Sequence, residues 1–506
     1  MIGRIAAAMQ AVGPVRAAFL GSLLLSLAAV QGHLINRDGI YYLETARAIL
    51  DRGLAAGLEN GEWSFLPVLI AARSGLTGLN PEWAAQCLNA LLMAGAGALM
   101  VVWVRARRPE DAWAACLVVL AMPAFNQYRH EILREFGFWF FSLLGLWLAM
   151  RWDETQRRRL AAASQAALAL AVLFRLEAAV FYPALMLWQA MAAPAGDKAR
   201  RVLTIGALPL AGGLLAILLF GTGWMKPPAR LLYYLDVANP LHIGQAIGEA
   251  ANRMTETVFK HKYSREEAGY VLLFGLLSVI PVKFVQLAGV FLVPLAGSFF
   301  MRPARDELSR WQPLPWALLA YLLVLTAFVS YQFFLVGRYV SMLHWLLVPP
   351  AAGGLALLLR RWPRWKMPIL ALALATMLSN VVSSSPRKTH IVEAGRWLAA
   401  NASDRGRVGL DNARIAHYAG WPGRTSLILT RAQLAEALEE GRVDLVVIEV
   451  PRKDAQAEPW LEENRLRVVR RFANRAGEAA IVAEPVRSQA RPATAERSRS
   501  NTDRME

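Results

Sequence analysis

The sequence predicts an all-α polytopic membrane protein with about eleven transmembrane helices, followed by a small soluble α/β domain. Three observations predict this class. The 506 residues are 56% hydrophobic and only 18% charged, which is too little charge for the surface of a soluble protein of this length. Long apolar stretches alternate with short arginine clusters, as expected where lipid replaces water as the solvent. The tail after residue 385 instead carries short strand and helix patterns.

Apolar stretches of roughly 20 residues define the predicted spans, because a hydrocarbon core of ~30 Å needs a helix of about that length. A shorter apolar stretch, 64–79, contains Arg73 and is predicted to lie in the interface or to re-enter the membrane without crossing it. The predicted spans lie near 15–35, 83–104, 111–126, 136–150, 160–175, 178–195, 202–222, 270–300, 313–335, 339–359 and 367–384.

The basic residues predict the orientation of these spans. Every second loop carries at least two Arg or Lys, whereas the alternate short turns hold only Arg129, Arg134, Arg175 and Arg338. By the positive-inside rule the N-terminus is cytoplasmic and the C-terminal domain periplasmic, as in a bacterial inner-membrane protein. The net charge of +17 is explained by this topology, so no nucleic-acid partner is expected.

The chain is predicted to have three parts. Residues 1–385 form the membrane domain, with outer loops at 36–82, 126–135 and 223–267. Residues 386–486 form an extracytoplasmic α/β domain, and the Arg/Ser/Thr-rich stretch 487–506 is predicted to be disordered. Within the α/β domain we predict strands at 407–411 and 443–450, a helix at 430–440, and a hairpin from 466–472 and 479–483.

The first candidate site lies directly after the first span. Apolar residues at 42, 43, 46, 49 and 50 mark one face of a helix, so this segment is predicted to be an amphipathic helix on the outer membrane surface. Asp38 stands at its start, at the boundary between water and lipid. An Asp before a helix is a favoured N-cap, so capping and catalysis are both open interpretations of Asp38.

The second candidate site is the outer turn before the aromatic-rich helix that starts near Phe136. Glu131 and Glu135 are four residues apart and are predicted to share a helix face. The alternative is a salt-bridge cluster at the interface, although acids at a membrane edge are costly and suggest a function. Arg175 and Arg338 lie at the same predicted level, where each either snorkels towards water or binds a phosphate group.

Two acidic sites and several arginines at one membrane level suit glycosyl transfer from a lipid phosphate. The leaving lipid phosphate is a stable anion, so positive charge is sufficient to stabilise it and no general acid is required. The acceptor hydroxyl needs a base, which a carboxylate can supply. One in-line displacement would invert the anomeric centre, by analogy with inverting glycosidases.

At these residues the chain resembles the GT-C superfamily of polyprenyl-phosphate-sugar-dependent glycosyltransferases, which includes protein O-mannosyltransferases and lipid A aminoarabinose transferases. The resemblance covers about residues 15 to 360. Asp-Gly-Ile-Tyr-Tyr at 38–42 resembles the first-loop acidic motif of that superfamily, and the stretch 131–135 resembles the second-loop motif. The stretches 173–177 and 337–339 resemble segments near the carrier phosphate. Unlike many relatives, the chain has Gly39 rather than a second acid after Asp38, and it contains no Trp-Trp-Asp motif of oligosaccharyltransferases.

The resemblance implies a role for each candidate residue. Asp38 inherits the role of the base, and the second-loop acids Glu131 and Glu135 are further catalytic candidates. Substrate contacts are expected from Tyr41, Tyr42 and Tyr339. The donor phosphate is expected to bind Arg129, Arg134, Arg175 and Arg338.

The expected partners are a polyprenyl-phosphate-linked sugar donor, membrane lipids, and an acceptor glycan, lipid or protein. No cofactor is predicted. Two other classes of function stay open: a transporter or flippase for a lipid-linked glycan, and a non-catalytic subunit of cell-envelope assembly. A transporter would place charged residues along a path within its helices and often shows internal repeats. An assembly subunit would tolerate the loss of Asp38.

Overall fold

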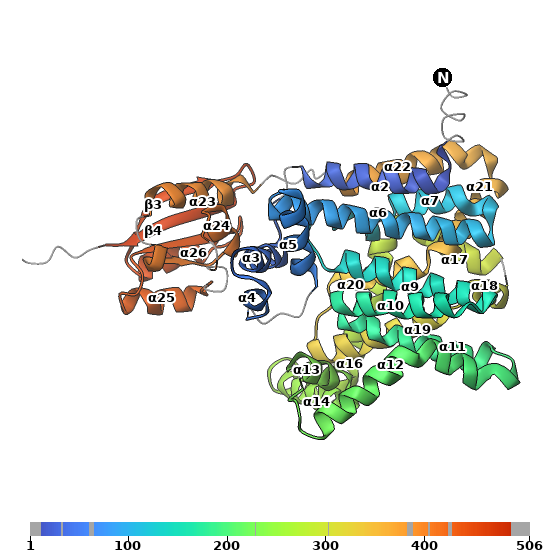
Figure 1. Ribbon diagram of the computed structural model, residues 1–506. Coiled ribbons are helices and arrows are strands. Elements are labelled where there is room, and N and C mark those ends of the chain that lie inside the picture. Colours follow the sequence, from blue (N-terminus) through green and yellow to red (C-terminus); the bar gives the residue numbers. More distant parts are fainter. Residues whose placement is uncertain are drawn as a thin grey trace, which may run out of the picture. The chain divides into compact units, whose positions relative to one another are not determined.

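The computed structural model describes residues 12–31, 34–59, 65–227, 229–301, 303–381, 388–402, 405–421, 423 and 428–486. The chain divides into two compact units, Met1–Ser385 and Pro386–Glu506 (Figure 1). The tail 487–506, for which we predicted disorder, lies outside the described residues.

Among its described residues, the regular secondary structure of the first unit is entirely helical, which suits lipid because backbone polar groups must be satisfied within each segment. Its α-helices are α2 (Pro14–Val30), α3 (Arg37–Arg52), α4 (Leu54–Glu59), α5 (Leu66–Thr77), α6 (Pro81–Arg107), α7 (Ala112–Ala121), α8 (Pro123–Asn126), α9 (Glu135–Thr155), α10 (Arg158–Phe174), α11 (Phe181–Ala192), α12 (Lys198–Gly221), α13 (Ala229–Ala238), α14 (Pro240–Thr257), α15 (Lys262–Glu266), α16 (Ala268–Ala288), α17 (Leu292–Met301), α18 (Ala304–Arg310), α19 (Leu314–Gln332), α20 (Gly337–Leu346), α21 (Val348–Arg361) and α22 (Lys366–Val381).

Several of these helices suit a membrane by length and composition. Among the described residues, four continuous segments are long and apolar enough to cross: Pro81–Arg107, Ala195–Gly221, Ala268–Met301 and Leu314–Gln332. The pair α20 and α21, bent by 65°, makes a fifth if it is counted as one span. Helices also stand at the other predicted positions, but several are shorter than a full span, so the count of eleven stays a prediction.

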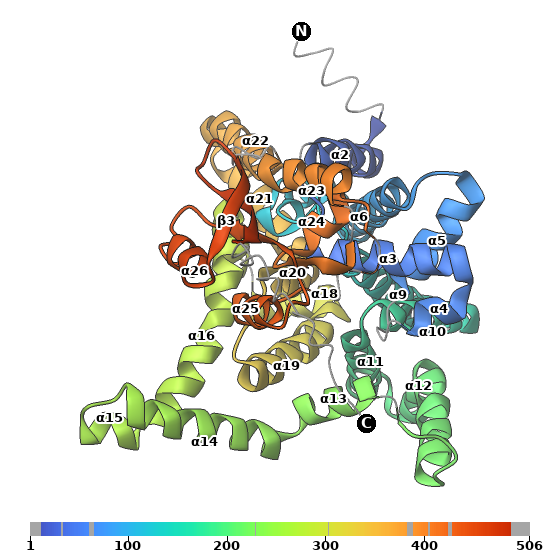
Figure 2. The same ribbon diagram turned by 90° about the vertical axis from the view of Figure 1, so that its left-hand side faces the viewer.

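The helices pack as a bundle whose outer surface is apolar. Helix α2 contacts α6, α7 and α22, helix α7 contacts α6 and α22, and α9 pairs with α10 (Figure 1). Helix α12 exposes large apolar side chains, among them Leu214, Ile217 and Leu218. Such an exposed surface is unfavourable in water and favourable in lipid. Helices α13 to α15 form a peripheral excursion between α12 and α16 (Figure 2).

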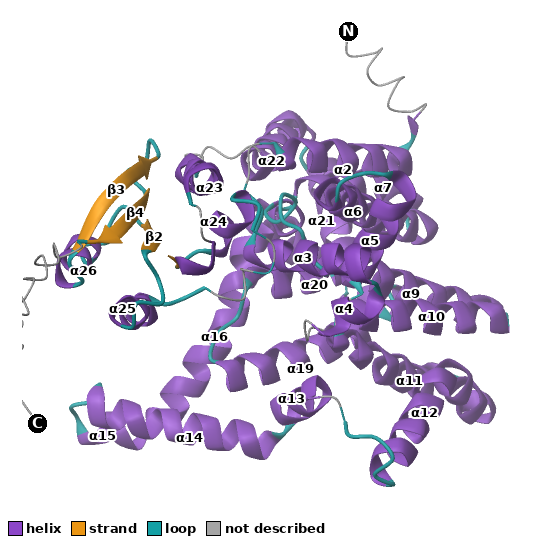
Figure 3. Cartoon of the chain, turned by 60° about the vertical axis from the view of Figure 1, so that its left-hand side comes forward, coloured by secondary structure: helices purple, strands orange, loops and turns teal. Residues whose placement is uncertain are grey.

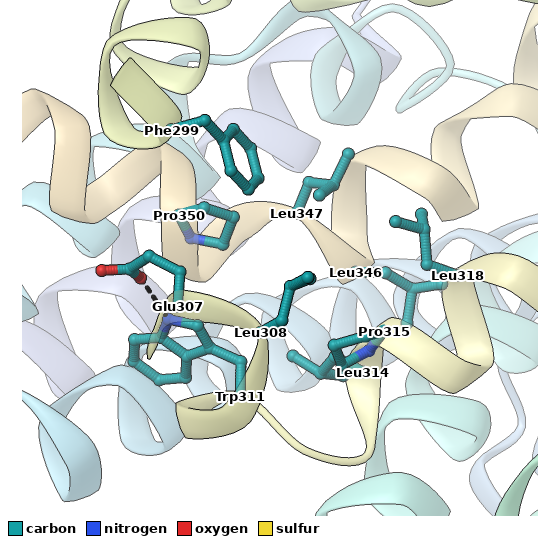
Figure 4. A pocket seen from close by; sticks show the side chains of 10 residues that line it. All are labelled: Phe299, Glu307, Leu308, Trp311, Leu314, Pro315, Leu318, Leu346, Leu347 and Pro350. Atoms are coloured by element: carbon teal, nitrogen blue, oxygen red, sulfur yellow. Dashed lines mark hydrogen bonds between the residues drawn. The ribbon is translucent and has the colours of Figure 1, made fainter. Parts of the chain in front are cut away.

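A buried ion pair joins α6 to α18, in loops that the sequence places on the inner side. The guanidinium of Arg108 donates a 2.6 Å hydrogen bond to Glu307, and the Trp311 indole N–H donates to the other oxygen of that carboxylate at 2.9 Å. Figure 4 shows Glu307 and Trp311, with the hydrogen bond between them, among the residues that line a small cavity of about 50 Å³ whose other lining residues are apolar. Removing either charge would leave the other buried without its partner, so the pair anchors the short helix α18.

The second unit is a small α/β domain with a four-stranded sheet, seen as orange arrows in Figure 3. Strands β1 (Val408–Leu410) and β2 (Leu445–Val450) are parallel, and β4 (Ala479–Pro485) pairs antiparallel with both β2 and β3 (Leu466–Ala473), in the order β1-β2-β4-β3. Its helices are α23 (Thr389–Asn401), α24 (Ala413–Tyr418), α25 (Arg431–Glu439) and α26 (Ala457–Glu463). The predicted strands, helix and hairpin are therefore confirmed.

Local sequence explains these elements. Helix α25 begins with a capping box, in which the Thr430 hydroxyl accepts from the Gln433 backbone N–H and the Gln433 side chain accepts from the Thr430 N–H. Alternate residues of β2 and β4, including Val446, Ile448 and Ile481, pack against α25 and α26. Successive side chains of a strand point to opposite faces of the sheet, so every second residue of β2 and β4 reaches this core.

Candidate active site

Helix α3 brings the first acidic residue to the site. Of the predicted apolar face of this helix, Tyr42, Leu43 and Ala46 are buried, whereas Leu50 is exposed. Asp38 is its second residue, in the first turn, whereas Asn36 occupies the N-cap position. The interpretation of Asp38 as the cap residue is therefore wrong by position.

The second acidic segment differs from its prediction in one respect. Helix α9 begins at Glu135, and Glu131 lies in the turn before it, so the two acids do not share a helix face. A carboxylate in the first turn of a helix interacts favourably with the positive end of the helix dipole, which suits Glu135. The two acids nevertheless approach the same arginine.

Arg338, at the start of α20, connects both acidic segments. Its Nη2 donates a 2.6 Å hydrogen bond to Asp38 Oδ2. Its Nη1 lies 3.6 Å from Glu131 Oε2, and its Nε lies 3.1 Å from Glu135 Oε1. One guanidinium therefore gathers three carboxylates that are far from it in the sequence.

Arg338 and its three carboxylates form one centre of charge. Arg175, which follows α10, forms a second centre that is more deeply buried. Its Nη1 donates to Glu135 Oε1 at 2.6 Å and its Nη2 to Glu177 Oε1 at 2.5 Å. The guanidinium lies over the ring of Tyr339, 4.2 Å from the ring centroid, which is the geometry of a cation–π contact. Because Glu135 contacts Arg175 and Arg338, it joins the two centres.

Burial divides the cluster into two layers. The side chains of Asp38, Glu131 and Arg338 are 41%, 21% and 18% exposed. Those of Glu135 and Arg175 are 3% and 4% exposed. Only the first layer can therefore meet an acceptor that arrives from water.

The turn before α20 is tightly constrained. A Cβ on Gly337 would lie 2.3 Å from the hydroxyl oxygen of Tyr128, so a larger residue would displace the Tyr128 side chain. The hydroxyl of Tyr321 donates to the Tyr339 carbonyl at 3.0 Å. Tyr321 thus holds the backbone of Tyr339, and Tyr128 packs against the turn at Gly337. Neither tyrosine is predicted from the sequence, because nothing in its local pattern separates it from the other tyrosines of the chain.

Arg129 lies outside this cluster, against its predicted role at the donor phosphate. Its side chain is buried and donates to Asn126 Oδ1 at 2.6 Å, and to the hydroxyl oxygens of Ser22 and Ser26 at 2.9 and 3.0 Å. The guanidinium therefore fastens the second acidic segment to α2. We assign Arg129 to packing and do not include it in the site.

The other predicted residues, Tyr41, Tyr42 and Arg134, come from the same two acidic segments. Tyr42 is buried in the helical core and makes an edge-to-face contact with Tyr41, with ring centroids 6.0 Å apart. Arg134 precedes α9 and lies within electrostatic reach of Tyr42 and Glu177.

An apolar cavity of about 500 Å³ adjoins the charged cluster. Glu177, the partner of Arg175, is one of its lining residues, and Tyr234 of α13 is another polar one. The remaining lining is apolar and comes mainly from α11, α13 and α19: Leu176, Val180, Pro183, Ala184, Leu187, Val237, Ala238, Trp316, Leu319, Ala320, Leu323, Val324 and Ala327. An apolar cavity with a few polar groups at one place is typical of ligand sites.

Arginine side chains supply the positive charge of the charged cluster. Asp38, Glu131 and Glu135 converge on the Arg338 guanidinium. Within the described part of the chain, no cluster of three or more His, Cys, Asp or Glu side chains has the geometry to hold a metal ion.

Neither a known family model nor a curated protein matches the sequence. Solved structures do match the fold. The Archaeoglobus fulgidus oligosaccharyltransferase tethered to an acceptor peptide is 11% identical, with a TM-score of 0.52 over 92% of this chain and 73% of that chain. The same enzyme in complex with zinc and sulfate gives 11% identity and a TM-score of 0.50, over 92% and 72% of the two chains. ArnT from Cupriavidus metallidurans is 14% identical, with a TM-score of 0.43 over 94% and 98%.

These similarities establish the fold and nothing finer, because the identities are low. The chain has the GT-C fold, and the resemblance found in its sequence is confirmed at that level.

Proposed function

We propose that this protein transfers a sugar from a polyprenyl-phosphate donor to an acceptor hydroxyl on the outer face of the bacterial inner membrane. The observation that carries the proposal is the junction at Glu177, where the arginine–carboxylate cluster adjoins an apolar cavity of about 500 Å³. An isoprenoid chain requires an apolar cavity, and guanidinium groups are the natural partners of its phosphate.

Asp38 is the proposed base. Its carboxylate is the most exposed acid of the cluster, so an acceptor hydroxyl can reach it from water. Asp38 removes the hydroxyl proton while the acceptor oxygen bonds to the anomeric carbon. The bond from that carbon to the phosphate oxygen breaks, and the lipid phosphate leaves with the electron pair. A single displacement of this kind inverts the anomeric configuration.

Arg338 is the proposed contact to the donor phosphate. Its guanidinium belongs to the exposed layer and is shared among Asp38, Glu131 and Glu135. A phosphate that binds there competes with these carboxylates and takes over part of the guanidinium fork. Arg175 contributes positive charge from the buried layer and also holds Glu177 at the edge of the cavity.

The two second-loop acids receive different roles. Glu135 is buried between Arg175 and Arg338, so it sets the spacing of the two guanidinium groups. Glu131 is more exposed and is the second choice for the base. Tyr339, stacked on Arg175, keeps its proposed place beside the substrate.

The cavity also bears on the transporter alternative. A conduit for a glycan needs polar groups along its length. Here Glu177 and Tyr234 are the principal polar lining residues, and the rest of the lining is apolar. This arrangement favours a bound hydrocarbon chain over a moving sugar.

Reconstitution of the full chain in proteoliposomes tests the proposal. Undecaprenyl-phosphate-linked sugars with a labelled sugar are supplied one at a time, together with an outer-membrane lipid extract as a source of acceptors. We expect release of undecaprenyl phosphate and movement of the label to a new product. Movement of intact donor across the bilayer with no such release would instead establish the transporter.

A further inference from the structure

Asn36 makes a contact that its position does not predict. An Asn at the N-cap of a helix ordinarily accepts a hydrogen bond from the first turn of that helix. The side chain of Asn36 makes no such bond to α3. Its Oδ1 accepts from the Ile132 backbone N–H at 2.9 Å, and its Nδ2 donates to the Ile132 carbonyl at 3.3 Å.

This two-way bond joins the two acidic segments across 96 residues. Asp38 follows Asn36 by two residues, and Ile132 directly follows Glu131. A carboxamide suits this task because it presents an NH2 donor group beside a carbonyl acceptor, which match the carbonyl and N–H of a single residue. The bond therefore holds the backbones of the two segments together close to the positions of the two acids.

Gly39 makes room for the contact. A Cβ at this buried position would lie 2.5 Å from Asn36 Oδ1 and 3.0 Å from Ile132 Cβ. Any larger residue would push the Asn36 side chain or the second acidic segment away. The glycine next to Asp38 is thus explained by close packing.

Two carboxamides of α6 hold the same backbone segment from another side. Gln86 Nε2 lies 3.4 Å from the His130 carbonyl, and Asn89 Nδ2 lies 3.5 Å from the Glu131 carbonyl. These are long, one-sided bonds, so they restrain the segment less than the paired bonds of Asn36.

We propose that Asn36 is a positioning residue that sets the distance between Asp38 and Glu131, and so the geometry in which Arg338 binds both. The inference rests on the proposed function, because the groups being positioned are the proposed base and phosphate contact. Asn36 itself touches no reacting atom.

A spectroscopic experiment tests the positioning without any transfer assay. The full chain, with Cys87 and Cys116 replaced by alanine, carries spin labels at the exposed positions Arg37 and Gln127. Asn36→Ala should at least double the width of the distance distribution between the labels. The matched control is Asn80→Ala, which removes a true cap bond to the Trp83 N–H and should leave the width unchanged. An unaltered width in Asn36→Ala would overturn the proposal.

The Asn36→Asp variant separates positioning from a general loss of structure. A carboxylate keeps the acceptor for Ile132 N–H but faces the Ile132 carbonyl without a donor. At pH about 8 this variant, which has almost the shape of the wild type, should therefore show a distance distribution as wide as that of Asn36→Ala. An Asn36→Asp variant with the wild-type width at this pH would contradict the inference.

Kinetics give a third measurement once a donor has been identified by the reconstitution described above. Asn36→Ala should lower kcat by roughly 10- to 100-fold and leave the donor KM within about twofold, because misplacement of a base affects the reaction more than donor binding. An unchanged kcat with a raised KM would refute positioning of the base. If the wild type transfers no sugar, the proposed function fails, and the spin-label result still decides whether Asn36 joins the two segments.

Discussion

The guanidinium of Arg338 donates a 2.6 Å hydrogen bond to the carboxylate of Asp38, although 300 residues separate them. This bond brings the start of α3 to the start of α20, and Glu131 and Glu135 complete the contact from a third segment. The predictions that follow test this cluster, the cavity beside it and the C-terminal domain.

Asp38→Asn should reduce transfer by about 10²- to 10⁴-fold, because the amide keeps the shape of the side chain but cannot accept a proton. The measurement is the initial rate in membranes that hold equal amounts of protein. Asp51→Asn, at the exposed far end of the same helix, is the control and should retain the wild-type rate. Comparable rates for Asp38→Asn and the wild type would remove Asp38 as the base and point to Glu131.

The two arginines should respond differently to alanine. Arg338→Ala should raise the donor KM and weaken binding of undecaprenyl phosphate, with Arg338→Lys restoring only part of the loss because the guanidinium fork is absent. Arg175→Ala breaks a buried ion pair and should cost roughly 3–5 kcal/mol of stability, seen as a lower Tm in detergent. Equal Tm losses for the two variants would contradict the division into an exposed and a buried layer.

Filling the cavity should weaken carrier binding. Ala320→Trp places a large side chain among the lining residues and should lower the affinity for undecaprenyl phosphate by about tenfold, which corresponds to ~1.4 kcal/mol. Leu322→Trp, on the same helix but outside the lining, is the control and should bind normally. Binding can be followed by native mass spectrometry. If both variants bind like the wild type, the carrier chain lies elsewhere.

The C-terminal sheet should lose stability as the pH rises from about 4 to about 7. Burial raises the pKa of Asp411 to about 7, and the nearby Glu449 carboxylate adds to this effect. An unfolded Asp has lost its proton above pH ~4, whereas the folded domain keeps it until about pH 7, so the free energy of unfolding falls across this window.

Hydrogen exchange of β2 in the full chain, corrected for the intrinsic pH dependence, measures this stability. Asp411→Asn should remove the pH dependence and protect β2 more strongly at pH about 8. Glu436→Gln, on the exposed face of α25, serves as the control and should leave the dependence intact. An Asp411→Asn variant with the wild-type slope would show that another group titrates.

The topology also makes a direct prediction. With the basic loops inside, alkaline phosphatase fused after Lys388 should be active, and the same enzyme fused after Arg158 should be inactive. The opposite pattern would place the C-terminal domain in the cytoplasm and remove the outer face as the site of transfer.

The sequence by itself determined the helical membrane class, the amphipathic helix after the first span and the strands of the C-terminal domain. These features follow from apolar periodicity and composition, which are local properties of the chain. Asp38 and Glu131 were also identified as candidates, because an acid beside a long apolar run is costly and therefore informative.

Only the tertiary structure decided how these residues meet. The shared partner Arg338, the buried place of Glu135, the packing role of Arg129 and the bond from Asn36 to Ile132 all depend on contacts between segments about 40 to 300 residues apart. The same residue types at the same spacing are compatible with a helix cap, with an arginine that snorkels towards water, or with an active site. Helix packing selects among these because it determines which charges share a buried volume, and a buried charge is stable only beside its partner.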